Sequence, residues 1–111
     1  MSRKTKEEQV EVVNELPPEL LIYLDPPISF GGKEADVIAL REPKVCEVLQ
    51  ADKHLKSAVT TEAIRNYQVA LIAAVSGLQR QHIEQLPIRK LNEAAKYLQG
   101  FLDAGQETSE S

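Results

Sequence analysis

The spacing of apolar residues between Thr61 and Leu102 restricts the fold of this chain more than any other feature of its sequence. In the first half of this stretch, apolar side chains recur at the intervals of one face of an α-helix. These side chains are Ile64, Tyr67, Leu71, Ile72, Val75 and Leu78. Thr60 or Thr61 can cap the start, and Gly77 suits the left-handed residue that ends a helix. The pattern therefore predicts a helix over residues 61–77.

The same helix is apolar at every position from Val69 to Val75, so its reverse side is apolar as well. A helix that is apolar all round is usually buried on two sides, which favours a central place in the core. The alternative is that one side is kept for a protein partner or for a second copy of the chain. On that alternative, the candidate partner-binding residues of this helix are Val69, Ala70 and Ala73.

A second amphipathic helix is predicted over residues 87–104. Its apolar stripe consists of Leu91, Ala94, Ala95, Leu98, Phe101 and Leu102. Pro87 fits the first turn of this helix, where a missing N–H removes no hydrogen bond. Phe101 is expected to be the most buried aromatic side chain. Residues 79–86, between the two helices, predict a short helical connector in which Ile83 and Leu86 point inward.

The N-terminal half of the chain predicts a β-hairpin over residues 20–41. Leu20–Leu24 is rich in strand formers, Asp25-Pro26-Pro27 interrupts the strand, and Val37–Leu40 forms the return strand. Gly31-Gly32 is a turn signal, because glycine adopts positive φ at little steric cost. Since two strands alone are marginally stable, the hairpin is expected to pack on the helices.

A further short helix is predicted over residues 43–52, after the hairpin. Pro43 is tolerated in its first turn. Val45, Val48 and Leu49 share one side of this helix, and they are expected to form its inner face. Cys46 is expected to be a small residue in the core or half-buried beside it.

These elements predict an α+β fold in which an N-terminal β-hairpin packs on a small bundle of three or four helices. A length of 111 residues suits one domain, which we place at residues 19–104. Residues 1–18 are charged and end in Pro17-Pro18, so they are expected to form a mobile arm. Residues 105–111 are expected to form a frayed acidic tail.

The net charge of −4 is carried by the two ends of the chain. Residues 20–102 contain ten basic and nine acidic side chains, so the predicted domain is almost neutral. This balance argues against a dedicated nucleic-acid-binding protein. No apolar run approaches the roughly 18 residues of a membrane span, and the charged first residues lack the apolar core of a secretory signal. With a single cysteine, these features predict a cytosolic protein in a reducing compartment.

No constellation of catalytic or metal-binding residues is recognisable in the sequence. His54 and His82 are too few for a metal cluster, and no carboxylate or cysteine stands at ligand spacing to them. Cys46 has no evident activating base, and Gly31-Gly32 lacks the following lysine and helix of a phosphate loop. The sequence therefore predicts a non-enzymatic protein without cofactor or metal, with His82 on the surface of the connector.

One alternative function arises within residues 70–86, which have the spacing of a DNA-binding helix-turn-helix. Ala73 would be the small residue at the helix crossing and Gly77 the turn, with Ile83 and Leu86 on the buried side of the second helix. Arginine and glutamine side chains can pair with guanine and adenine edges in the major groove. The residues that would face that groove are Gln79, Arg80, Gln81, His82 and Gln85.

The order of sequence blocks resembles a known family. The blocks are the predicted hairpin, Leu40-Arg41-Glu42-Pro43, the segment from Leu71 to Leu78, then Ile83, Leu86, Pro87 and finally Gly100-Phe101-Leu102. Over roughly residues 20–102 the chain is similar to the small tail assembly chaperones of long-tailed bacteriophages, the group that includes the Mu-like tail chaperones. Such proteins coat the long, aggregation-prone tape measure protein before the tail tube polymerises.

The resemblance implies a non-enzymatic function in the host cytoplasm. The implied partners are the tape measure protein and the tail tube protein. Self-association is expected on a separate ground, because the apolar surplus of the central helix could form a surface between two copies. Nucleic acid and membranes are not expected partners. A third possibility is a structural tail component that stays in the virion.

The chain departs from the family pattern at the start of the last helix. We expect an acidic or capping residue there, but this chain has Arg89-Lys90. Arg89 and Lys90 are therefore either a solvated helix start or candidate contacts for an acidic partner surface.

Overall fold

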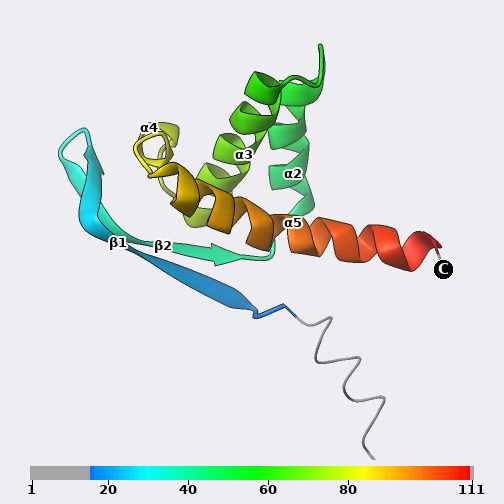
Figure 1. Cartoon of the computed structure of the whole chain (residues 1–111), viewed down its shortest axis with the longest axis horizontal. Coiled ribbons are helices and arrows are strands. Elements are labelled where there is room, and N and C mark those ends of the chain that lie inside the picture. Colours follow the sequence, from blue (N-terminus) through cyan, green and yellow to red (C-terminus); the bar gives the residue numbers. More distant parts are fainter. Residues whose placement is uncertain (1–15, 111) are drawn as a thin grey trace, which may run out of the picture.

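A computed structural model describes the backbone of residues 16–110 and the side chains of residues 16–103 (Figure 1). The predicted mobile arm of residues 1–18 lies, for the most part, outside the described residues. Of its last three residues, which are described, Leu16 lies beside Gly100 and Pro17 accepts a hydrogen bond from Tyr97 of the final helix. The described chain consists of a two-stranded sheet followed by helices, which confirms the predicted α+β fold.

The hairpin is formed by β1, Glu19–Phe30, and β2, Lys33–Arg41, which pair in antiparallel orientation. Gly31 and Gly32 make the turn with φ of 62° and 78°. These left-handed values explain why two glycines stand at the tip, since residues with a Cβ rarely adopt them. The predicted turn position is confirmed.

The two strands are in register on both sides of a wide bulge. Tyr23 pairs with Val37 and Ile28 pairs with Ala35, so Leu24–Pro27 oppose the single residue Asp36. Two prolines lie in this bulge, where their missing N–H groups remove no ladder hydrogen bond. The predicted interruption at Asp25-Pro26-Pro27 is confirmed, and the strands pair again from Ile28 to Phe30.

Four helices and one 3-10 turn follow the hairpin. They are α2, Val45–Asp52; η1, Lys53–Leu55; α3, Thr61–Ser76; α4, Arg80–Ile83; and α5, Ile88–Glu110. The Thr60 hydroxyl caps α3 by accepting the N–H of Ala63 at 3.0 Å, and Gly77 ends α3 with φ of 80°. Helix α5 runs past residue 104, the predicted end of the last helix. The glycine at position 105 does not stop it, because one glycine in a helix costs only about 1 kcal/mol.

The core lies between one face of the hairpin and the helices. In Figure 1, α2 and α3 run side by side, and α5 passes across them and continues beyond the hairpin. The buried apolar side chains come from both strands and from all four helices. They include Ile22, Leu24, Ile28, Ile38, Leu40, Ala51, Leu71, Ile72, Val75, Ile83, Leu91, Ala94 and Leu98. None of the described helices combines the length and the apolar character needed to cross a membrane.

Among the tyrosine and phenylalanine side chains the most buried is Tyr97, not Phe101 as predicted. The Tyr97 hydroxyl donates to the carbonyl oxygen of Pro17 at 2.6 Å, so the ring can be buried with its polar group satisfied. Phe101 is half-buried one turn later. Its ring packs edge-on against the Tyr97 ring, with the two ring centroids 5.2 Å apart. Burial raises the pKa of the Tyr97 hydroxyl, so it stays a donor at neutral pH.

The predicted inner face of α2 is wrong. Val45 and Leu49 are 75% and 60% exposed, and Cys46 is exposed as well. Helix α2 buries Ala51 against the core and leaves Val48 half-buried. A helix of two turns can pack only a narrow strip of its surface against the core, and in α2 that strip includes Ala51.

The predicted surface position of His82 is also wrong, because this side chain is 1% exposed. Its Nε2 atom hydrogen-bonds with the carbonyl oxygen of Lys33 at 3.1 Å, and its ring meets Phe30 edge-on. The hairpin tip therefore covers α4 and encloses the imidazole. No feature near His82 in the sequence indicates this contact, which joins residues far apart in the chain.

Candidate partner-binding site

The most exposed apolar helix face in the described structure lines a groove between α2 and α5. We name it the α2–α5 groove, and its volume is about 250 Å³. Its lining residues are Glu42, Pro43, Val45, Val48, Leu49, Phe101 and Leu102. Apart from the carboxylate of Glu42 at the rim, the side chains are apolar. An exposed apolar groove between two helices is the kind of surface that binds another protein.

Helix α2 is held in place by an ion pair between Glu47 and the end of β2. The Arg41 guanidinium donates two hydrogen bonds to the Glu47 carboxylate, at 3.0 and 2.8 Å. Glu47 also accepts the backbone N–H of Lys44 at 2.8 Å, which satisfies a donor of the first helical turn. These contacts join the start of α2 to the end of β2 beside the groove.

The same contacts determine the ionisation of Glu47. The hydrogen bonds from Arg41 lower its pKa from 4.5 to about 2, against a smaller opposing effect of burial. Glu47 therefore stays charged over the whole physiological range. The ion pair is partly open to water, with the Arg41 side chain 40% exposed, so its contribution to stability is at most about 1 kcal/mol.

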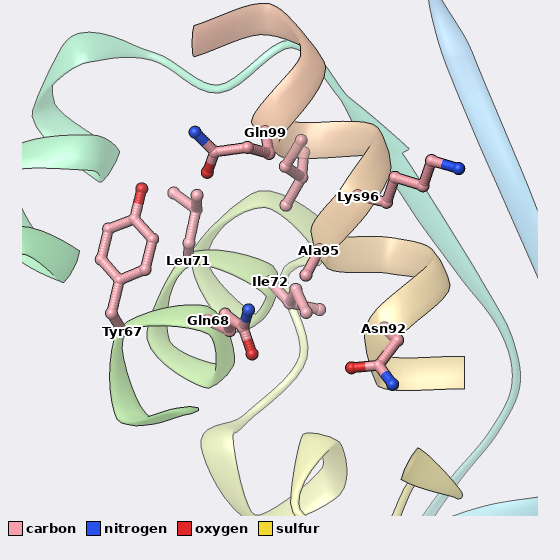
Figure 2. Close-up of a pocket in the computed structure, with 9 residues that line it drawn as sticks. Tyr67, Gln68, Leu71, Ile72, Asn92, Ala95, Lys96 and Gln99 are labelled. Carbon is pink, nitrogen blue, oxygen red and sulfur yellow. The ribbon is translucent and has the colours of Figure 1, made fainter. Parts of the chain in front are cut away.

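A second hollow of about 260 Å³ lies between α3 and α5 (Figure 2). Leu71, Ile72, Ala95 and Leu98 form its apolar floor. Polar side chains surround the opening, namely Tyr67, Gln68, Asn92, Lys96 and Gln99. We call it the α3–α5 pocket.

The α3–α5 pocket has no groups for nucleophilic or acid–base chemistry beyond one amine and one phenol. Burial raises the pKa of the Tyr67 hydroxyl, so this group acts as a hydrogen-bond donor at neutral pH. Its lining includes no carboxylate, imidazole or thiol. Within residues 16–103 no three metal-ligating side chains come together. The pocket thus combines an apolar floor with hydrogen-bonding groups around its opening.

The five predicted site residues occupy two separate places. Val69 is buried, and Ala70 and Ala73 are half-buried against the core. Arg89 is exposed in the first turn of α5, and Lys90 lines a hollow beside the Asp25-Pro26-Pro27 bulge. None of the five lines the α2–α5 groove.

Sequence reasoning did not identify the residues of the α2–α5 groove as a surface. The pattern predicts Val45 and Leu49 on an inner face and Phe101 as the most buried aromatic side chain. Helical periodicity shows that these residues share a side, but it does not show what that side faces. The only usable signal is the short length of α2, because a two-turn helix rarely buries a full apolar stripe.

The geometry disfavours the helix-turn-helix alternative. Helix α4 is a single turn, too short to serve as a recognition helix in the major groove. Its polar side chains are engaged within the fold: Arg80 binds Asn66 and, at 2.8 Å, Glu84. Gln85 donates to the carbonyl oxygen of Ser29, and His82 is buried. Three of the five side chains that would read DNA are therefore engaged within the fold, while Gln79 and Gln81 are exposed.

Comparison with protein families gave one match. The family model described as "Phage tail assembly chaperone proteins, E, or 41 or 14" matches residues 21–103. The matched region begins inside β1 and ends inside α5, so it includes the hairpin and every helix before the C-terminal part of α5. Neither the curated proteins nor the solved structures gave a match.

Proposed function

We propose that this chain, which belongs to the phage tail assembly chaperone family, binds the tape measure protein and keeps it soluble before the tail tube forms. Its place in tail assembly follows from the family. The identity of the partner, the location in the host cytoplasm and the absence of catalysis are parts of the proposal. Binding would mask apolar segments of the partner without any covalent step.

The α2–α5 groove is the observation that carries the proposal. Val45 and Leu49 from α2 and Phe101 and Leu102 from α5 form two apolar walls. An amphipathic helix can place one apolar stripe between two such walls, which is a common way for helical partners to bind. A long helical protein that must be kept from aggregating offers such stripes repeatedly.

The charged residues at the start of α5 provide a second proposed contact. Arg89 is exposed, and Lys90 is half-buried beside the hairpin bulge. We propose that both attract acidic residues of the partner and so affect the association rate more than the lifetime of the complex. Val69, Ala70 and Ala73 are not proposed as direct contacts, because they lie in or against the core.

Co-expression with the tape measure protein from the same source tests the proposal. The tagged chain is expected to co-elute with a soluble partner at about 0.15 M salt and again at about 0.5 M salt, because apolar contacts are not screened. The Leu49→Lys variant places a charge in the groove and is expected to lose the partner. Val59→Lys is the matched control, because Val59 is 72% exposed outside the groove.

Two results would contradict the proposal. The first is a tape measure protein that aggregates equally with and without this chain. The second is equal loss of binding in Leu49→Lys and Val59→Lys, which would show that the groove is not the docking site. Circular dichroism of both variants establishes that each is folded.

A further inference from the structure

The hairpin has a second face that the rest of the described structure leaves largely exposed. Residues that pair across the strands point to the same face, and the pairs Leu20–Leu40 and Ile22–Ile38 point into the core. The alternate pairs point away from it. We call them the outer face of the hairpin, consisting of Glu19, Leu21, Tyr23, Val37, Ala39 and Arg41.

The outer face is apolar at its centre. Tyr23 is 68% exposed and Leu21 is 44% exposed. Ala39 is exposed beside them, and Val37 is half-buried. A two-stranded sheet gains little stability by itself, and apolar side chains on its free face favour covering by another layer.

The two strands contribute different chemistry to this face. β1 supplies an acid and two large side chains, in the order Glu19, Leu21, Tyr23. β2 supplies a base and two smaller side chains, and in the register of the sheet Arg41 lies beside Glu19, Ala39 beside Leu21 and Val37 beside Tyr23. The face is thus divided lengthwise into a large, acidic half and a small, basic half.

We propose that the outer face of the hairpin binds the same face of a second copy of this chain. A two-fold axis parallel to the strands places β1 of each copy over β2 of the other. This operation sets Leu21 on the partner's Ala39, Tyr23 on the partner's Val37, and Glu19 on the partner's Arg41. Large side chains then meet small ones and acid meets base, as a self-complementary two-fold interface requires.

Arg41 can take part without giving up its role at α2. Its guanidinium has five N–H donors, and it makes two hydrogen bonds to Glu47 and one to the carbonyl oxygen of Glu42. Stacked sheets that pack face to face keep their strands within about 30° of each other, which a two-fold axis along the strands permits.

The other two-fold arrangement fits less well. An axis across the strands would set Leu21 against the partner's Leu21 and Ala39 against the partner's Ala39. The first contact crowds two large side chains, and the second leaves a gap. Tyr23 would then face the partner's Glu19, so an apolar ring would cover a carboxylate. The division of the face therefore selects the axis along the strands.

The dimer does not depend on the proposed binding of the tape measure protein, because it concerns the chain alone. It would give one particle two α2–α5 grooves, and two linked sites hold a long repetitive partner more strongly than one.

The test measures the mass of the purified full chain by sedimentation equilibrium from micromolar to millimolar concentration. The wild type is expected to form a dimer. Tyr23→Lys and Val37→Glu are each expected to raise the dissociation constant about tenfold or more, because each places a charge against an apolar side chain. Val59→Lys, an exposed apolar residue outside the hairpin, is the control and is expected to dimerise like the wild type.

Mixing the two variants tests the orientation. In a mixed dimer along the proposed axis, the introduced lysine at position 23 faces the introduced glutamate at position 37, while the second contact stays Tyr23 on Val37. The mixture is therefore expected to dimerise when neither variant does so alone. A wild type that stays monomeric at millimolar concentration would overturn the proposal. So would a mixture that stays monomeric, or a Tyr23→Lys variant that dimerises normally through the partner's Glu19, while circular dichroism shows both variants folded.

Discussion

Helices α2 and α3 carry the same kind of apolar pattern, yet only α3 buries it. In α3, Leu71, Ile72 and Val75 lie in the core, whereas in α2, Val45 and Leu49 face solvent along the groove. The difference lies in the neighbours rather than in the pattern. Helix α3 is enclosed by the hairpin and by three other helices, while α2 contacts α3 along one line near Ala51. An apolar stripe therefore becomes core in one place and an interaction surface in the other.

Alanine substitutions give the largest expected effect and the most direct way to break this comparison. Ile72→Ala is expected to lower the free energy of unfolding by about 3 kcal/mol, because it leaves a cavity in a fully buried site. Leu49→Ala is expected to change it by no more than about 0.5 kcal/mol, since Leu49 is exposed. Urea denaturation followed by circular dichroism measures both. Equal losses would show that α2 is packed as tightly as α3.

Substitution at the start of α3 is expected to have an intermediate effect on the free energy of unfolding. Thr60→Ala is expected to cost about 1 kcal/mol, because the Thr60 hydroxyl caps the helix by accepting the N–H of Ala63. Thr61→Ala is expected to be nearly neutral, since Thr61 is the first residue of the helix and is exposed. The same denaturation experiment compares them. A larger loss of unfolding free energy in Thr61→Ala than in Thr60→Ala would show that Thr60 is not the cap of α3.

The ion pair that attaches α2 to β2 gives the smallest expected effect on the free energy of unfolding, and this effect depends on pH. Since the pKa of Glu47 is lowered from 4.5 to about 2, the ion pair with Arg41 stabilises the fold fully above about pH 4.5. That stabilisation is lost as the pH falls from about 4.5 through about 2. Glu47→Gln is expected to cost about 0.5–1 kcal/mol at neutral pH.

The difference in unfolding free energy between wild type and Glu47→Gln is therefore expected to shrink on acidification. Urea titrations at pH values on both sides of this window measure it. A difference that grows as the pH falls would contradict the assigned ion pair.

Local signals were sufficient to predict much of the fold. The two glycines at 31 and 32 located the turn, the two prolines located the bulge, and the dense apolar run from Val69 to Val75 located the central helix. Each of these features is decided by the backbone preferences or the spacing of neighbouring residues.

The remaining features depend on contacts between distant parts of the chain. His82 is buried because the hairpin tip, about fifty residues earlier, covers it. Tyr97 can be more buried than Phe101 because the carbonyl oxygen of Pro17 accepts a hydrogen bond from its hydroxyl. The groove residues were missed for the same reason, since the exposed side of α2 is set by the path of α5. Periodicity identifies which residues share a face, and only the tertiary structure shows what the face meets.

Hydrogen exchange of the wild-type chain, alone and bound to the tape measure protein, tests the central claim most directly. The two-turn helix α2 is expected to exchange rapidly in the free protein, because little of it is packed. Binding in the groove predicts that amides of residues 45–52 and of the part of α5 around Phe101 become strongly protected, while α3 changes little. Protection confined to the hairpin or to α3, with α2 still exchanging rapidly, would contradict the assignment of the α2–α5 groove as the docking site.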